Sequence, residues 1–135
     1  MGYYTEFVFA CELKDNVPED VVQILKFIIL DESTGESVPL PDHELFATDR
    51  WHCIGLCSSY YFAFTEPCSN LVYDEISKSW KVVIRSSLKN YCNEIEKFVD
   101  WLKPYIERGS GRNRNFLGYW MNEDGEEPTL IWLDK

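Results

Sequence analysis

The stretch Trp80–Leu102, WKVVIRSSLKNYCNEIEKFVDWL, changes from one hydrophobic periodicity to another along its length. At its start, Val82 and Ile84 alternate with two basic residues and a valine, which predicts a strand over Trp80–Ser87. One of the two asparagines that follow can cap a helix. The next apolar positions have the spacing of one helical face and are Ile95, Phe98, Val99 and Leu102. The stretch therefore predicts a strand that leads into an amphipathic helix.

The same order of elements is found near the N-terminus. Residues Tyr4–Leu13 are rich in β-formers, with Phe7 and Phe9 on one side of a period-two pattern, which predicts a strand. Asn16–Asp20 then supplies a capping side chain, a proline that the first helical turn tolerates, and two acidic residues that the helix dipole favours. The apolar face of the helix that follows comprises Val21, Ile24, Leu25 and Ile28.

Further strands are expected in the middle and at the end of the chain. Aromatic residues are dense at Tyr60–Phe64, and Thr65–Ser69 has the composition of a turn into a strand at Asn70–Asp74, so a hairpin is predicted. Near the C-terminus, Phe116–Met121 and Thr129–Leu133 flank an acidic turn and predict two more strands.

Two segments are expected to be irregular. The connection Ser33–Arg50 has turn residues without a sustained period, so we expect a long loop with one short helical turn at Asp42–Phe46. Pro104 removes one helical hydrogen bond, so the last turn of the second helix should be irregular. The segments together predict an α+β fold, with an antiparallel sheet of about six strands and two helices in a single domain of residues 1–135.

The predicted elements follow the order strand, helix, strand, strand twice, which indicates two repeats over residues 1–75 and 76–135. The apolar faces of the two helices match at an offset of 74 residues, and Leu71–Tyr73 matches Leu130–Trp132 at an offset of 59. The smaller offset means that the first half has extra chain after its helix. Because any two amphipathic helices share this periodicity, two unrelated units are an equal alternative.

This order of elements resembles the duplicated architecture of the gyrase-inhibitor-like small-molecule-binding domains. The resemblance is one of element order, without a shared sequence motif, and it carries over no binding residue. It implies two modules packed edge to edge, with a cleft between their helices or sheet faces.

A second resemblance lies in the sequence itself. The run Ser87–Phe98, followed by Phe116–Trp120 and Pro128–Trp132, is similar to a group of small uncharacterised proteins encoded by bacteria and their prophages. The resemblance implies a bacterial or phage origin and a cytoplasmic location, and it implies no mechanism.

Acidic residues are concentrated in the first part of the chain. The whole chain has 23 acidic and 13 basic residues, a formal net charge of −10, whereas residues 1–75 alone have 14 acidic and 3 basic residues. Proteins that bind nucleic acid gain affinity by neutralising phosphates with basic groups, so with a net charge of −10 neither nucleic acid nor an anionic membrane is an expected ligand. The acidic residues in the long connection and directly before it are either a solvated face or a binding surface for a basic protein partner. They are Asp31, Glu32, Glu36, Asp42, Glu44 and Asp49.

The five cysteines are scattered and odd in number, which is typical of free thiols in a reducing compartment. The run His52–Cys57 places one histidine and two cysteines close together, and His43 and Cys68 could complete a set of zinc ligands. The gap between Cys53 and Cys57 and the lack of a second cysteine pair are untypical of zinc sites. We therefore expect no metal and no cofactor.

Motifs for catalysis are not recognisable in the sequence. Neither His43 nor His52 lies in a nucleophile motif, and no phosphate-binding, dinucleotide-binding or metalloprotease pattern occurs. His52 or Cys53 would be the first candidates in an enzyme, but we expect a binding protein. The N-terminal residues form neither a signal peptide nor a membrane-spanning run, so a cytoplasmic protein is expected.

Two functions agree with these observations. The first is an acidic, non-enzymatic interaction protein, in concrete form a phage or bacterial inhibitor that binds a basic, nucleic-acid-handling host protein. The second is a small-molecule-binding module with an aromatic cleft between two repeats. The aromatic residues assigned to that cleft are Trp51, Tyr60, Trp101 and Trp120.

Overall fold

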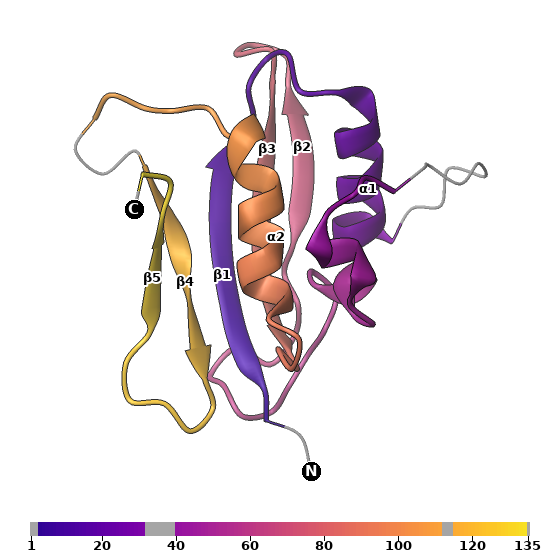
Figure 1. Cartoon of the computed structure of the whole chain (residues 1–135). Helices are drawn as coiled ribbons and strands as arrows, with labels where there is room; N and C mark the ends of the chain where they lie inside the picture. The colour runs from indigo at the N-terminus through magenta and orange to yellow at the C-terminus, as the bar shows by residue number, and fades with distance from the viewer. Residues whose placement is uncertain (1–2, 32–39, 112–114, 135) are drawn as a thin grey trace.

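The computed structural model describes residues 3–31, 40–111 and 115–134, which form two helices on one face of an antiparallel sheet (Figure 1). The helices are α1 (Glu19–Leu30) and α2 (Glu94–Leu102). The strands within these ranges are β1 (Thr5–Glu12), β2 (Asn70–Asp74), β3 (Ser79–Leu88), β4 (Phe116–Asn122) and β5 (Thr129–Trp132). Short 3-10 helices are η1 (Glu44–Ala47), η2 (Trp51–Cys53) and η3 (Lys103–Tyr105). The predicted α+β class is confirmed.

The sheet is built from two interlocked strand-helix-strand units. Its strand order is β2-β3-β1-β4-β5, and each neighbouring pair is antiparallel. Consequently β1 and β2 are parallel to each other with β3 between them, and β3 and β4 are parallel with β1 between them. This is the split βαβ arrangement of ferredoxin-like domains, to which β5 adds an edge strand.

The aromatic segment Tyr60–Phe64 forms no strand, so the described part of the sheet has five strands and the predicted six are not confirmed. The chain on either side of this segment does reach β3, through backbone hydrogen bonds of Cys57 and Cys68. Between them the chain leaves the sheet as a loop, which a hydrogen bond from Ser59 N–H to Thr65 O closes at 3.2 Å. We call Ser59–Thr65 the aromatic loop.

The predicted repeats are not confirmed either. The sequence alignment pairs β2 with β5, but the strand that lies beside the central β3–β1 pair opposite β2 is β4, and β5 lies one position further out. In the interlocked units the strand that follows α1 is β2 and the strand that follows α2 is β4, so β5 has no counterpart in the first half. The two units also share neighbours, since β1 pairs with both β3 and β4, instead of packing edge to edge as separate modules.

The core lies between the helices and the sheet. Phe7 and Phe9 of β1 face the helices, and both rings meet Phe98 of α2 edge to face at centroid distances of 6.0 and 5.8 Å. Such pairs add about 0.5–1.5 kcal/mol beyond the burial of their surface. The apolar faces expected for both helices are buried, and Pro104 lies in η3, so the irregular end of the second helix is confirmed. No helix in the described ranges is long and apolar enough to cross a bilayer.

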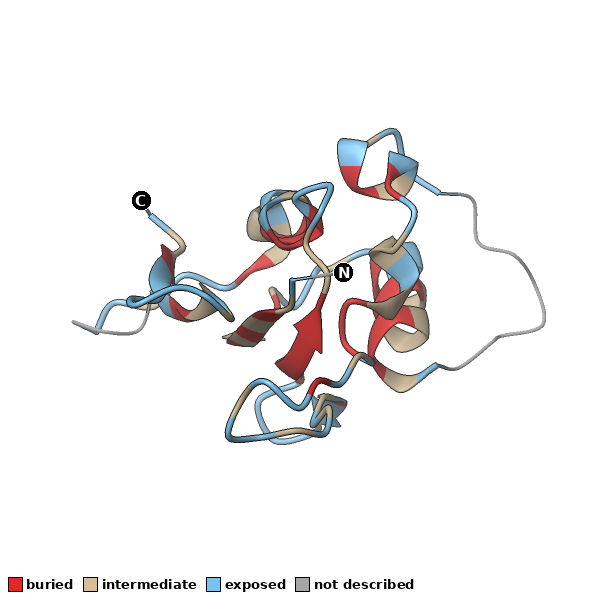
Figure 2. Cartoon of the chain, turned by 90° about the horizontal axis from the view of Figure 1, so that it is seen from below, coloured by how far each residue is buried: buried red, intermediate tan, exposed pale blue. Residues whose placement is uncertain are grey.

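The opposite face of the sheet carries no helix in the part of the chain that the structure describes (Figure 2). Val72 and Val83 are each 46% exposed and Leu130 is 54% exposed, and the strand registers place all three side chains on this open face. The aromatic loop covers one end of it, where Phe64 packs over Arg85.

Candidate protein-binding surface

Aromatic rings attach the long connection to both helices. Phe46 of η1 meets Trp101 of α2 at 5.4 Å and Trp51 of η2 at 5.0 Å between centroids, both edge to face. Trp51 in turn lies 5.8 Å from Phe27 of α1. Because these rings bridge α1 and α2, they fix the connection on the helix side of the molecule. We call this cluster the aromatic junction.

His43 holds η1 against α2 through two hydrogen bonds. Its Nδ1 accepts from the Leu45 backbone N–H at 3.0 Å and so caps η1. Its Nε2 lies 2.9 Å from Oδ2 of Asp100 in α2. Since Nδ1 is an acceptor, the proton of a neutral ring resides on Nε2, which donates to the carboxylate. The sequence alone did not indicate this contact, because it joins residues 57 positions apart.

The contact gathers carboxylates from two separate segments. Asp42, Glu44 and Asp49 lie in or beside η1 and are exposed, and no ion pair among the described residues engages them. The Asp100 side chain is 78% exposed, and Glu96, one helical turn before it, is also exposed. We call these five residues the acidic surface.

Three of the six acidic residues predicted to bind a partner therefore belong to the acidic surface. Asp31 is exposed at the C-cap of α1, at the opposite end of the connection. Glu32 and Glu36 lie outside the described residues. The structure adds Glu96 and Asp100, which lie in the second helix outside its predicted apolar face.

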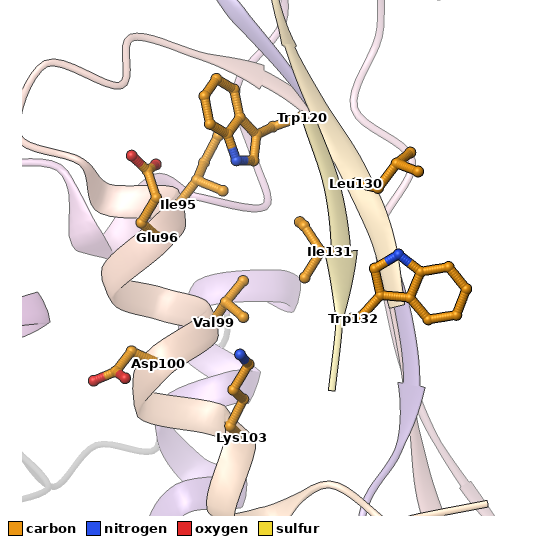
Figure 3. A pocket seen from close by; sticks show the side chains of 9 residues that line it. All are labelled: Ile95, Glu96, Val99, Asp100, Lys103, Trp120, Leu130, Ile131 and Trp132. Carbon is orange, nitrogen blue, oxygen red and sulfur yellow. The ribbon is translucent and has the colours of Figure 1, made fainter. Parts of the chain in front are cut away.

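A groove of about 240 Å³ separates α2 from the last two strands (Figure 3). Ile95 and Val99 of α2 face Trp120 and Ile131 of the sheet across it. The Lys103 side chain lies at one end, and the two α2 carboxylates of the acidic surface lie on the outer rim. The groove is thus apolar inside and charged at its margins.

The four aromatic residues predicted to line one cleft occupy three separate places. Trp51 and Trp101 belong to the aromatic junction, where Trp101 is only 5% exposed. Trp120 lines the groove beside α2. Tyr60 lies on the aromatic loop and is 91% exposed. Only Trp51 and Trp101 are therefore brought together.

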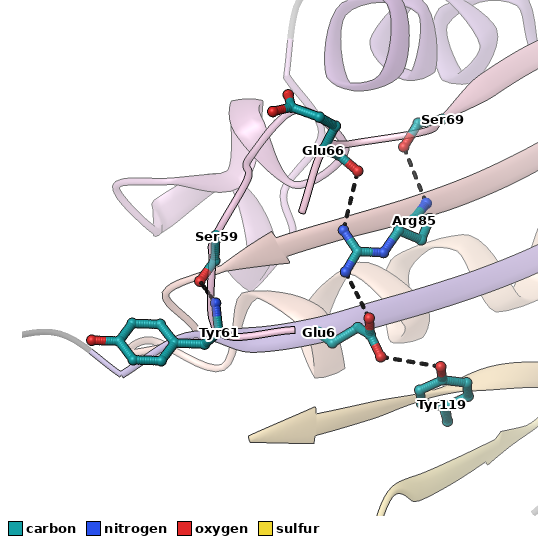
Figure 4. Close-up of polar contacts among 7 residues, drawn as sticks. All are labelled: Glu6, Ser59, Tyr61, Glu66, Ser69, Arg85 and Tyr119. Carbon is teal, nitrogen blue, oxygen red and sulfur yellow. Dashed lines mark hydrogen bonds and ion pairs between the residues drawn. The ribbon is translucent and has the colours of Figure 1, made fainter. Parts of the chain in front are cut away.

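A polar network lies beneath the aromatic loop (Figure 4). Arg85 Nη2 donates to Glu6 Oε2 at 2.6 Å, and Nη1 donates to the Glu66 backbone oxygen at 3.2 Å. The Tyr119 hydroxyl donates to Glu6 Oε1 at 3.1 Å. Burial is the main reason why the pKa of Tyr119 lies above its ordinary value, and the neighbouring Glu6 carboxylate raises this pKa further. The network is mostly enclosed, so it anchors the loop to the sheet.

The residues considered as metal ligands are engaged locally. Within the described ranges no group of three or more histidine, cysteine or acidic side chains is placed to hold a metal ion. Cys57 Sγ donates to the Cys53 backbone oxygen at 3.1 Å, and Cys53 Sγ donates to that of Arg50 at 3.3 Å. Burial, reinforced by Cys53, raises the pKa of Cys57 to about 12. His52 stacks on Phe27 at 6.3 Å.

Comparisons of the chain with models of protein families, with curated proteins and with solved structures found no match. The arrangement of strands does not assign a function either, because ferredoxin-like domains carry many unrelated activities. A function therefore has to be inferred from the surfaces described above.

Proposed function

We propose that the chain is a non-enzymatic protein-binding module that docks on a basic partner protein through the acidic surface. The observation that supports this best is the contact between His43 and Asp100, which joins η1 to α2 and gathers exposed carboxylates from both. Carboxylates held near one another without counter-ions repel, and a basic partner relieves that repulsion on binding. Complementary charge also raises the rate of encounter and disfavours wrong partners.

More specifically, the proposed partner is a protein that handles nucleic acid. The phosphate-binding surface of such a protein is basic, so the carboxylates of the acidic surface can take the place of phosphates there. A bound chain would then exclude the nucleic acid and act as an inhibitor. The resemblance to bacterial and prophage-encoded proteins supports a bacterial cell as the place where the chain would meet this partner.

Binding of a small molecule is the second candidate function, and the groove supports it. Its volume of about 240 Å³ lies below the range of about 300–1,000 Å³ for most small-molecule sites. The aromatic residues expected in one cleft are also dispersed. We therefore favour protein binding.

Affinity capture from a bacterial lysate tests docking through the acidic surface. The baits are the wild-type chain, a test variant and a control variant with the same change in net charge. The test variant is D42K/E44K/D49K, and the control is D15K/E75K/E107K. The control residues are exposed and outside the acidic surface, and unfolding curves establish that all three baits are folded.

We expect the wild type and the control to capture the same basic protein, identified by mass spectrometry, and the test variant to lose it. Added nucleic acid should release the captured protein. Full retention of every specific partner by D42K/E44K/D49K would refute docking through the acidic surface.

A further inference from the structure

β5 is an edge strand, and no strand of the described ranges lies beside it on the side away from β4. Leu133 N–H donates inward to Asn115 O at 2.8 Å. Because main-chain groups alternate in direction along an antiparallel strand, Ile131 also faces β4, and Leu130 directs its N–H and C=O outward. The main-chain groups of an edge strand can serve as a template for another strand. The opposite edge strand, β2, differs because α1 packs against it.

The groove lies on the α2 side of this edge. Ile131 of β5 points toward α2, where it faces Val99 (Figure 3). Leu130 points to the other side of the sheet. A strand added outside β5 would direct every second side chain to the α2 side as well. An apolar side chain placed there would cover the groove wall formed by Val99 and Ile131.

The two ends of this site differ in charge. The turn that leads into β5 carries exposed Asp124, Glu126 and Glu127. Lys103 lies at the other end of the groove. Basic residues are therefore favoured beside the turn, and apolar residues are favoured along β5. An extended segment with that order of residues is complementary to the whole site.

We propose that the outer edge of β5, together with the groove and the acidic turn, binds an extended basic and apolar segment of the partner by strand addition. This inference rests on the proposed protein-binding function and names a second contact with the same partner. Main-chain hydrogen bonds to β5 supply affinity, and the groove and the turn select the side chains.

Titration of the isotope-labelled full chain with a capped hexapeptide, Lys-Lys-Val-Leu-Val-Thr, tests this site by NMR. We expect saturable shifts at the Leu130 amide and at the Trp120 indole N–H. Hydrogen exchange of the Leu130 N–H should slow, because it gains an acceptor. The charge-reversed peptide Glu-Glu-Val-Leu-Val-Thr should bind about fivefold more weakly or worse.

Leu130→Pro removes the outward N–H, which an edge strand tolerates. Leu130→Ala is the matched control, since it keeps the N–H. We expect Leu130→Pro to weaken peptide binding about tenfold or more and Leu130→Ala to change it less than about twofold. If Leu130→Pro does not fold, the peptide is changed instead, by N-methylation at its leucine or at its valines. N-methylation of the peptide N–H that donates to β5 should weaken binding as strongly as Leu130→Pro is expected to.

Three results would contradict strand addition: wild-type affinity in Leu130→Pro, shifts confined to other surfaces, or no saturable shift. Equal affinity for N-acetyl-leucine amide would make the groove a small-molecule site and would also contradict it. The variant D42K/E44K/D49K should bind the hexapeptide within about twofold of wild type. The peptide titration therefore tests the edge site, and the affinity capture tests the acidic surface, so either proposal can be refuted without the other.

Discussion

Among the glycines that the structure describes, Gly118 has the least room for a side chain. Its φ is 148°, and it lies where the register between β4 and β5 shifts. A Cβ there would lie 1.9 Å from the Val8 carbonyl oxygen. We expect Gly118→Ala to lower the free energy of unfolding by about 2–4 kcal/mol, measured with denaturant. Gly125→Ala, whose Cβ would meet Asn122 O at 3.3 Å, should lose less than about 1 kcal/mol, and equal losses would contradict this account.

The Tyr119 hydroxyl is one of two donors that hold the Glu6 carboxylate beneath the aromatic loop. Tyr119→Phe should lower the free energy of unfolding by about 1 kcal/mol, because one oxygen of the carboxylate loses its donor. Tyr60→Phe is the control, since Tyr60 is 91% exposed, and it should change the same free energy by less than about 0.5 kcal/mol. Indistinguishable effects in denaturant unfolding would show that the hydroxyl contributes nothing.

Thiol protonation gives a pH-dependent prediction. Burial raises the pKa of Cys57 to about 12 and raises that of Cys11 as well. The unfolded chain releases these protons at lower pH, so the free energy of unfolding should fall as pH rises from the usual cysteine range toward about 12.

Iodoacetamide near pH 8 should alkylate exposed Cys68 and Cys92 first, as peptide mass spectrometry can show. Native-state alkylation of Cys57 at their rate would contradict the raised pKa.

The sequence predicts which residues are buried better than it predicts which polar side chains pair with one another. The period-two pattern places Phe7 and Phe9 in the core, and the structure confirms both. The pairing of Glu6 with Arg85 joins positions 79 residues apart. It depends on the register between β1 and β3, which no local pattern encodes.

Among the elements, η1 is held on α2 by the ring contact of Phe46 with Trp101 and by the hydrogen bonds of His43. His43→Ala removes both the cap of η1 and the donor to Asp100. We expect the Leu45 amide to exchange about tenfold faster or more, measured by hydrogen exchange and NMR. His52→Ala is the control at a second histidine, which does not cap η1, and should leave this rate unchanged. An unaltered Leu45 rate in His43→Ala would mean that other contacts hold η1.

The helices and the segment Tyr60–Phe64 show what local patterns can and cannot decide. Apolar faces place α1 and α2 within a few residues, and the short turn expected at Asp42–Phe46 is confirmed as η1. The side-chain cap expected before the first helix is wrong, because α1 begins after Pro18 without one. At the start of α2, Asn90 Oδ1 accepts from the Ile95 N–H at 2.9 Å, whereas the Asn93 side chain makes no capping bond. Aromatic residues suit both strands and exposed loop contacts. At Tyr60–Phe64 the choice is made by tertiary structure, because β3 already pairs with β2 and its remaining edge bonds to Cys57 and Cys68.

For the whole molecule, the order of elements does not determine the order of strands. Two units of a strand, a helix and further strands can pack edge to edge or interlock. The observed pairing of β1 with both β3 and β4 selects the interlocked arrangement. These pairings join distant parts of the chain, so the sequence alone gives the α+β class without its topology.

The charge imbalance of residues 1–75 reveals only three of the five residues of the acidic surface. Asp42, Glu44 and Asp49 belong to that acidic part of the chain. Glu96 and Asp100 belong to the nearly neutral remainder and join them only through the packing of η1 on α2. The surface is therefore a property of the fold.

Calorimetric titration of the purified, captured partner tests the acidic surface most directly. The wild type, D42K/E44K/D49K and D15K/E75K/E107K are compared at about 50 and about 200 mM salt. We predict that the first variant weakens binding about tenfold or more, that the control stays within about threefold of wild type, and that salt weakens wild-type binding. Equal affinity of the wild type and D42K/E44K/D49K at low salt would contradict the central claim.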